Sequence, residues 1–288
     1  MKLVDLHVHS YHSDGVLAPA ALVAMAAERG LASLAIADHD AVDGIDEAVA
    51  EGTRLGVDVI PAVELSVELG RFSDVHILGY CIDHHDPAFR ERLAGFRTAR
   101  DNRGKAILEK VNRRLLHSRK APLSYEEVRS MAGGAVGRPH IGRVLIEHGH
   151  ARDMEDAFRR YLIPCNVPKR YMPAGEAIAE IRRIGGVSVL AHPPTITDNR
   201  RRLRQVVEQL VHLGLDGLEV FNNLCFKDDM LYFERLAEEF GLLMTGGSDF
   251  HGFEDDVELG SGRGGLAVAH GLAEKVKELA AQRKHSHA

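Results

Sequence analysis

The sequence has no tryptophan, only three cysteines and no long apolar run among its 288 residues. Cys81, Cys165 and Cys225 form no CxxC pair, which favours a reducing compartment and argues against a disulfide framework or a thiolate zinc site. No apolar run approaches the roughly 18 residues of a membrane helix, and Asp5 interrupts any apolar signal-peptide region. We therefore expect a cytoplasmic protein without a membrane partner.

Positive charge is not in excess either. The chain has 36 Lys and Arg against 42 Asp and Glu, a formal net charge of −6. This balance offers no global basic surface for a long nucleic acid, but bound cations could still make a pocket positive. A small nucleotide or a short oligonucleotide therefore remains an acceptable partner. The pattern predicts no particular oligomeric state.

Short apolar strands alternate with amphipathic helices at both ends of the chain. The predicted strands cover residues 3–9, 33–37, 57–67, 74–82, 187–191, 217–221 and 242–246. The predicted helices beside them cover residues 18–29, 45–55, 175–184, 201–213 and 228–240. This order is typical of an α/β fold with a mostly parallel sheet. A distorted TIM-like barrel of seven β/α units fits better than an open sheet, because no glycine-rich dinucleotide turn follows the first strand.

The middle of the chain breaks this alternation. It contains no clear strand but several helical patterns, at residues 100–116, 124–131, 141–148 and 153–161. We predict that residues 101–165 form an inserted α-helical subdomain that selects the substrate at the mouth of the barrel. Residues 1–100 and 166–288 would then form the two parts of the barrel.

Histidines and carboxylates gather where the predicted strands end. The nine potential metal ligands are His7, His9, Asp14, His39, Glu64, His76, His192, Asp249 and His251. Because the carboxyl ends of parallel barrel strands meet at one face, we expect these side chains to converge. Nine ligands exceed the need of one tetrahedral zinc and predict two or three hydrolytic ions. Nitrogen and oxygen ligands without thiolate admit manganese, zinc or iron.

One of these residues, His76, lies early in its strand rather than at the end. A hairpin accounts for this position. With Gly70 as the midpoint, antiparallel pairing would place Glu64 opposite His76. Glu64 would then be the natural bridging carboxylate.

Six ordered blocks of the sequence resemble the PHP (polymerase and histidinol phosphatase) family. They are Asp5-Leu-His-Val-His9, Ala37-Asp-His-Asp40, Glu64, His76-Ile-Leu-Gly-Tyr80, Ala191-His-Pro193 and Gly247-Ser-Asp-Phe-His251. The resemblance implies a distorted seven-stranded barrel with a centre of three divalent ions, manganese first and zinc or iron as alternatives. It implies three ligand sets: His7, His9, Glu64 and Asp249; Glu64, His76 and His192; and Asp14, His39 and His251.

Two further motifs resemble one subgroup of this family, the nucleotide 5′-phosphatases and the 5′→3′ exonucleases of short RNA. They are Gly137-Arg-Pro-His-Ile-Gly-Arg143 and Pro168-Lys-Arg-Tyr171. Arg138, His140 and Lys169 are therefore candidates for binding a second phosphate or the sugar, with solvated surface positions as the alternative.

The resemblance implies a phosphomonoesterase that removes the 5′-phosphate of a small nucleotide, most simply a nucleoside 3′,5′-bisphosphate such as adenosine 3′,5′-bisphosphate. A hydroxide bridging two ions would attack phosphorus. Asp40 and His12 lie beside ligands and are candidates for protonating the departing alcohol; orienting His39 is an equally good role for Asp40, and His12 could be merely solvated. The alternatives are a 5′→3′ exonuclease on short RNA or DNA, a histidinol-phosphate phosphatase and a non-catalytic metal-binding module.

Overall fold

The computed structural model describes residues 2–132, 135–168 and 171–286. Its strands are β1 (Leu3–Val8), β2 (Leu31–Ile36), β3 (Asp58–Val59), β4 (Ala62–Leu69), β5 (Phe72–Tyr80), β6 (Met172–Pro173), β7 (Val187–Leu190), β8 (Gly217–Asn222), β9 (Leu243–Gly247) and β10 (Val268–Ala269). Its α-helices are α1 (Pro19–Glu28), α2 (Ile45–Leu55), α3 (Pro87–His117), α4 (Tyr125–Ser130), α5 (Arg138–Glu147), α6 (Met154–Ala157), α7 (Ala174–Arg183), α8 (Arg200–His212), α9 (Lys227–Phe240) and α10 (His270–Ser286). Two short turns complete them, the π-helical η1 (Phe158–Leu162) and the 3₁₀ η2 (Pro193–Thr195). Within these described ranges, no helix has the length and apolar character needed to cross a bilayer.

The described strands pair in two sheets, in the orders β10-β1-β2-β3 and β6-β4-β5-β7-β8-β9. Neighbours are parallel except β1–β10, β4–β5 and β5–β7, which confirms the predicted α/β class with parallel-rich sheets. Single bridges, Val8 to Phe250 and His39 to Glu64, connect the two sheets. The closed seven-stranded barrel stays a prediction, because the hydrogen bonding of the described strands gives two sheets.

The strand predicted at residues 57–67 is wrong as one element. The structure divides it into β3, which pairs with β2, and β4, which pairs with β5. Pro61 lies between the two halves and has no N–H to donate to a ladder, so a single continuous strand cannot form there. The two-residue strands β6 and β10 are too short to leave a periodic pattern and were not predicted.

The hairpin of β4 and β5 forms, but its predicted register is wrong by two positions. Glu64 is paired with Leu78, and His76 is paired with Ser66. The tight turn lies between the pair Leu69 and Phe72, and an irregularity after Val67 shifts the ladder beyond the expected midpoint. A shift of two positions keeps each side chain on the same face of the sheet. Glu64 and His76 therefore remain diagonal neighbours on one face.

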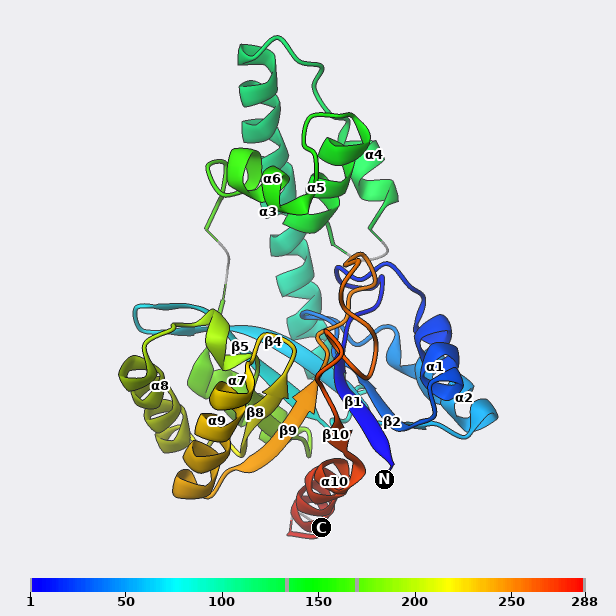
Figure 1. Ribbon diagram of the computed structural model, residues 1–288, viewed down its shortest axis with the longest axis vertical. Helices are drawn as coiled ribbons and strands as arrows, with labels where there is room; N and C mark the ends of the chain where they lie inside the picture. The colour runs from blue at the N-terminus through cyan, green and yellow to red at the C-terminus, as the bar shows by residue number, and fades with distance from the viewer. Residues whose placement is uncertain (1, 133–134, 169–170, 287–288) are drawn as a thin grey trace.

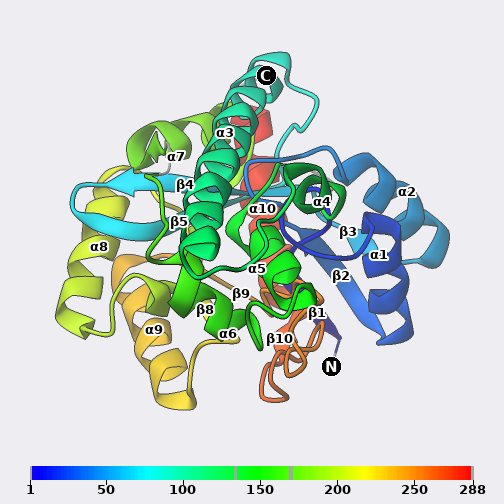
Figure 2. The same cartoon turned by 90° about the horizontal axis from the view of Figure 1, so that it is seen from above.

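A group of helices lies beyond one end of the strands (Figure 1). The 31-residue helix α3 extends away from the sheets, and α4, α5 and α6 gather around its far half, as the view from above also shows (Figure 2). Ile107, Val111, Leu115, Val128 and Ile141 belong to a separate core cluster of this group. The inserted subdomain at residues 101–165 stays a prediction, and its first proposed boundary falls within the continuous α3.

Asp216 connects the C-terminal helix to the larger sheet. Its Oδ2 accepts hydrogen bonds from Ser188 N and Oγ, both at 2.9 Å, and from Arg283 Nη1 of α10 at 2.8 Å. Arg283 Nη2 also contacts Oδ1. Burial alone would raise the pKa of Asp216, but Arg283 and the Ser188 hydrogen bonds hold that pKa below its ordinary value.

We expect Asp216→Asn to destabilise the metal-free protein by about 1.5–3 kcal/mol at pH 7, the range for hydrogen bonds to a charged group. Because the folded-state pKa is depressed, the carboxylate contributes its stability above the ordinary pKa of about 4 and loses it as pH falls below that value. Urea unfolding at pH 7, 5 and 3 should show a difference from wild type that shrinks only at pH 3. A difference of equal size at all three pH values would contradict this account.

Candidate metal centre

The structure brings all nine sequence-predicted ligands into one cluster. His7, His9, His39, His192, Asp249 and His251 lie at or just beyond the carboxyl ends of β1, β2, β7 and β9, Asp14 follows in the loop after β1, and Glu64 and His76 come from the β4–β5 hairpin. Two of the nine, His192 and Asp249, have positive φ values of 24° and 53°, and Asp40, next to His39, has a φ of 52°. The backbone is therefore held in sparsely populated conformations where it turns these side chains inward.

Glu64 is at the middle of the cluster and is fully buried. Its Oε1 lies 2.9 Å from His76 Nδ1 and 2.8 Å from His192 Nε2. Its other oxygen, Oε2, lies 2.9 Å from His39 Nδ1. One carboxylate thus faces imidazole nitrogens with both oxygens, which is the arrangement expected of a bridging ligand.

A second group of contacts joins the two ends of the chain. Asp249 Oδ1 lies 3.1 Å from His9 Nε2 and 3.5 Å from His7 Nε2. The same two nitrogens lie 3.4 and 3.5 Å from Glu64 Oε2. These four side chains form a compact set of two imidazoles and two carboxylates.

Asp14 lies at the middle of the third group of contacts. Its Oδ1 lies 3.5 Å from His251 Nε2, and its Oδ2 lies 3.8 Å from His39 Nε2. His9 Nδ1 lies 3.8 Å from Asp14 Oδ1, and ligand atoms of His9, Asp14, His39 and His251 lie within 4.8 Å of one another. The structure therefore places His9 between this group and that of Asp249, a position that the resemblance did not imply.

Three buried carboxylate oxygens in the cluster, Asp14 Oδ1, Glu64 Oε2 and Asp249 Oδ1, lie beside imidazole nitrogens but receive no well-formed hydrogen bond from the described residues. Burying a carboxylate oxygen without a donor is costly, and a cation relieves that cost. The donor set, imidazole and carboxylate without thiolate, also suits divalent transition ions. The residues present therefore fit a group of divalent metal ions.

The histidines of the cluster differ widely in pKa. Burial lowers the pKa of His39 to about 3, so its ring is neutral and can act as a ligand. Burial would also lower the pKa of His251, but the nearby carboxylate of Asp14 raises it to about 10. A protonated imidazole must lose its proton to bind an ion, so metal binding should release protons.

Glu219 is a functional residue that the sequence patterns missed. It is fully buried in β8, and its Oε1 accepts from His7 Nδ1 at 2.9 Å. Its Oε2 accepts from His192 N at 2.6 Å and from Asn222 Nδ2 at 2.9 Å. This places the Nε2 of His7 toward the cluster. An acid inside the otherwise apolar run Gly217–Phe221 was the available signal.

We expect Glu219→Gln to weaken metal binding and activity by about 10–100-fold, the usual effect of losing a carboxylate that orients a histidine ligand. A glutamine has one acceptor oxygen, whereas Glu219 accepts from groups on three residues, so at least one buried donor loses its partner. Metal content after dialysis and the metal concentration for half-maximal activity would measure this. Glu238→Gln on the exposed face of α9 is the matched control, and equal metal affinity in both variants would contradict the assignment.

Two further buried aspartates hold the loops of the cluster in place. Asp5 accepts from Ser248 N at 2.9 Å and from Gly260 N at 2.7 Å, which ties β1 to the segment after β9. Asp38 accepts from Ser10 N at 2.8 Å, which ties the end of β2 to the loop after β1. These bonds fix the segments that carry the ligands.

A cavity of about 430 Å³ opens beside the cluster. Asp14, His39 and His76 contribute to its wall, and Arg100, Arg103 and Arg138 line it from the helical group. Arg100 and Arg103 were not predicted, although they fall one turn apart on the expected helix. The cavity thus combines a metal-type cluster with three guanidinium groups, a combination suited to a phosphate ester.

These arginines are held by defined partners. Arg100 Nη2 donates to Asp14 Oδ2 at 3.3 Å. Arg103 Nε donates to Val167 O at 2.7 Å. The Arg138 guanidinium lies over the Phe158 ring, 5.3 Å from its centroid. The cavity therefore has cations at fixed positions rather than on free surface side chains.

The other predicted substrate residues are placed differently. His140 does not line this cavity: it is fully buried in α5, its Nδ1 accepts from Gly137 N at 2.9 Å, and burial lowers its pKa to about 4. Lys169 lies outside the described residues. Asp40 and His12 line a small hollow next to His39, and Asp40 Oδ1 accepts from Ser66 N at 3.3 Å.

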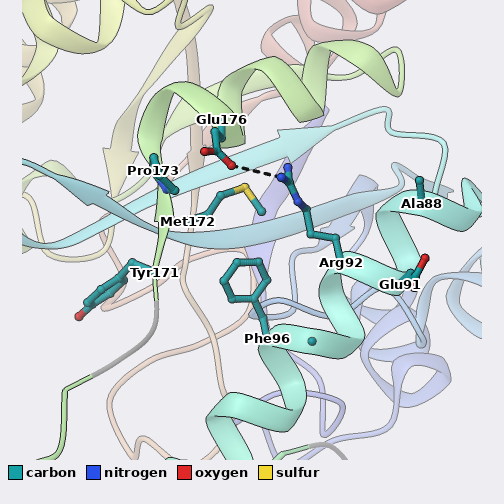
Figure 3. A pocket seen from close by; sticks show the side chains of 9 residues that line it. Ala88, Glu91, Arg92, Phe96, Tyr171, Met172, Pro173 and Glu176 are labelled. Atoms are coloured by element: carbon teal, nitrogen blue, oxygen red, sulfur yellow. Dashed lines mark hydrogen bonds and ion pairs between the residues drawn. The ribbon is translucent and has the colours of Figure 1, made fainter.

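A second cavity, of about 410 Å³, lies on another side of Tyr171 (Figure 3). Phe96, Met172 and the ion pair of Arg92 with Glu176, 3.1 Å long, line it. None of the nine clustered residues lines this cavity, so its walls lack the chemistry of the metal centre. Tyr171 is a lining residue of both cavities.

A buried cluster of histidines and carboxylates at the strand ends of an α/β fold is typical of metal-dependent hydrolases. Comparison with known families gives a more specific result: the model of the PHP domain family matches residues 5–164. The chain belongs to the PHP domain family.

Relatives cover almost the whole chain. A 3′,5′-nucleoside bisphosphate phosphatase from Chromobacterium violaceum is 33% identical, over 94% of this chain and 92% of its own. A 5′-3′ exoribonuclease from Haemophilus influenzae is 33% identical, over 90% and 93%. A crystal structure from Bifidobacterium adolescentis, of a protein with the proposed activity of a metal-dependent phosphoesterase, covers 96% of both chains with a TM-score of 0.84 and 28% identity. These relatives confirm the expected enzyme class, metal-dependent hydrolases of phosphate esters.

Proposed function

We propose that this PHP-family enzyme removes the 5′-phosphate from a nucleoside 3′,5′-bisphosphate. The observation that carries the proposal is the 430 Å³ cavity, whose wall joins the metal-type cluster to Arg100, Arg103 and Arg138. A substrate with two phosphates needs one reacting site and one remote anion site. The relative from Chromobacterium violaceum, which is named for a bisphosphate substrate, supports the same choice.

The proposed cofactors are three divalent ions, manganese first and zinc or iron as alternatives. Asp249 with His7 and His9, the pair His76 and His192, and Asp14 with His39 and His251 would hold one ion each, and Glu64 would bridge the first two sets. When bound, the ions supply Lewis acidity and an activated water nucleophile for attack on phosphorus. Three dications against three carboxylates leave the site with a positive charge, which favours a phosphate ester.

The protein's own side chains have three proposed tasks. Arg138 holds the remote phosphate, and Arg100 positions Asp14 and adds positive charge at the reacting phosphate. Asp40 or His12 gives a proton to the departing 5′-oxygen, because both line the hollow next to His39. His140 and Lys169 remain proposed substrate residues. His140 would act indirectly, because it accepts a hydrogen bond from Gly137 N and so fixes the start of α5, which carries Arg138.

The finer architecture belongs to the same proposal. The two sheets would be the halves of a distorted seven-stranded barrel, joined through the bridges of Val8 and His39. The helices between residues 101 and 165 would form a subdomain that selects the substrate, since Arg138 and Phe158 reach the cavity from them. The cytoplasm is the proposed location.

A 5′→3′ exonuclease acting on short RNA or DNA is the second candidate. The relative from Haemophilus influenzae is named an exoribonuclease and matches this chain at the same identity as the bisphosphate phosphatase. The same centre would then act on a phosphodiester, with the next phosphate of the oligonucleotide at Arg138.

Phosphate release by the manganese-loaded protein tests both candidates. The substrates are adenosine 3′,5′-bisphosphate, AMP, histidinol phosphate and a 5′-phosphorylated dinucleotide. We expect the highest kcat/KM with the bisphosphate, whereas mononucleotides released from the dinucleotide at a higher kcat/KM would favour the exonuclease. No reaction with any of the four, with metal bound, would overturn the proposal.

We expect Arg138→Ala to raise KM for the bisphosphate by about 10–100-fold, as the loss of a charge-assisted hydrogen bond predicts, with little change in kcat. The KM for AMP should hardly move, because AMP has no second phosphate. Arg113→Ala, at an exposed position of α3, is the matched control. Equal losses with both substrates would place Arg138 at the reacting phosphate instead.

A further inference from the structure

Three metal-ligating side chains meet on the surface, outside the nine-residue centre. Asp46 lies in the first turn of α2, and His84 and His85 form the turn between β5 and α3. His84 Nε2 lies 2.8 Å and His85 Nε2 lies 3.3 Å from the same oxygen, Asp46 Oδ1. Ligand atoms of the three residues lie within 4.8 Å of one another.

We propose that Asp46, His84 and His85 bind one additional divalent transition ion, of which Zn²⁺ is the representative. A tetrahedral ion with bonds of about 2.0–2.1 Å holds its ligand atoms about 3.3 Å apart. The spacing of His85 Nε2 from Asp46 Oδ1 has this value, and the ion would replace the 2.8 Å hydrogen bond of His84. Two imidazoles and one carboxylate without thiolate suit Zn²⁺, Cu²⁺ or Ni²⁺, whereas Mg²⁺ and Ca²⁺ prefer oxygen ligands. Water would complete the coordination, because Asp46 and His85 are exposed.

The charges around the three residues are compatible with a cation. Asp46 brings one negative charge to the two imidazoles, and its Oδ1 faces both of them. Arg90 is the nearby positive charge that acts on this carboxylate. It weakens cation binding without blocking it, because an exposed charge is screened by solvent.

The position of the three residues indicates what the ion would do. The segment before α2 carries His39 and Asp40, and Asp43 in that segment forms an ion pair of 3.0 Å with Arg97 of α3. Asp46 follows three residues after Asp43, in the first turn of α2. An ion held by Asp46, His84 and His85 would therefore strengthen the connection between this part of the chain and the start of α3. It would stabilise the folded state by linkage, because the unfolded chain does not preserve the three-ligand geometry.

Zinc binding by the metal-loaded full chain tests the proposal. Wild type and His84→Ala/His85→Ala are dialysed against the same micromolar Zn²⁺, and all bound metals are counted by mass spectrometry. We expect the double variant to hold one Zn²⁺ fewer per chain, with the ions of the main centre unchanged. Zn²⁺ should also raise the Tm of the wild type more than that of the variant.

Two further variants keep the test decisive. His117→Ala/His212→Ala removes two exposed histidines from α3 and α8 and should retain the wild-type zinc content. The single variant His85→Ala, at a side chain that is 59% exposed, should fold normally and bind the additional Zn²⁺ at least about tenfold more weakly, the effect of losing one ligand or its support. Equal zinc content in the wild type and the double variant would overturn the site, whatever the phosphatase assay shows.

Discussion

Replacing Glu64 by glutamine should remove both bound metal and activity, with kcat/KM falling by about 1000-fold or more, the order of losing a main electrostatic partner of the transition state. Its Oε1 faces His76 and His192, and its Oε2 faces His39. The variant has the same shape, so the fold should persist, but an amide carries no negative charge and its NH₂ cannot bind a cation. A loss of bound metal in this variant would therefore show that Glu64 is a metal ligand and not merely a packed core residue.

The strand β4 offers its own control for this experiment. Glu68 lies four residues further along the same strand and is exposed. Glu68→Gln should keep wild-type metal content and activity. An E64Q protein that retained all its ions, counted by mass spectrometry after dialysis, would contradict the placement of Glu64 as the bridging ligand.

Gly247→Ala should strongly destabilise the fold, although it adds only one methyl group. A Cβ at Gly247 would lie 2.4 Å from both the Cβ and the backbone N of His7, and the backbone of β1 cannot move aside as a flexible side chain could. We expect a loss of about 3 kcal/mol or more in unfolding free energy, at the upper end of overpacking costs. Since His7 would be displaced, metal affinity should fall as well.

Urea unfolding of the metal-free protein would measure this effect. Gly95→Ala is the matched control, because its Cβ would meet nothing within 4 Å and Gly95 lies in the middle of α3. That variant should be more stable than wild type by about 1 kcal/mol, through helix propensity. Wild-type stability in G247A would show that β1 and β9 do not approach as closely as described.

Local patterns were sufficient to locate the strand ends and the residues that follow them. His39, His192 and Asp249 each come within three residues of the end of an apolar run, so alternation alone could place them at one edge of the sheets. The structure brings all nine residues together; their division among three ions stays a prediction. Ladder register was predicted less well, because the β4–β5 irregularity after Val67 depends on how the turn packs and not on the midpoint of two residues.

Contacts between distant segments could not be predicted from the sequence. Glu219 contacts His7 although the two residues are 212 positions apart in the chain. This contact depends on how β8 packs near β1, which the local sequence does not indicate. Arg100 and Arg103 could not be identified from the sequence, because nothing local indicates that this part of α3 lines the cavity. The division of the predicted strand at Pro61 could have been predicted from the sequence, since proline interrupts the hydrogen-bond ladder of a sheet.

The close approach of β1 and β9 has a consequence for synthesis on the ribosome. His7 and His9 emerge first, but Asp249 and His251, which share their cluster, are made more than two hundred residues later. A nascent chain that ends before β9 has neither the two late ligands nor the strand that packs against His7. The complete centre can therefore assemble only after β9 and the segment that follows it have been made, and until then His7 and His9 lack Asp249 and His251 as neighbours.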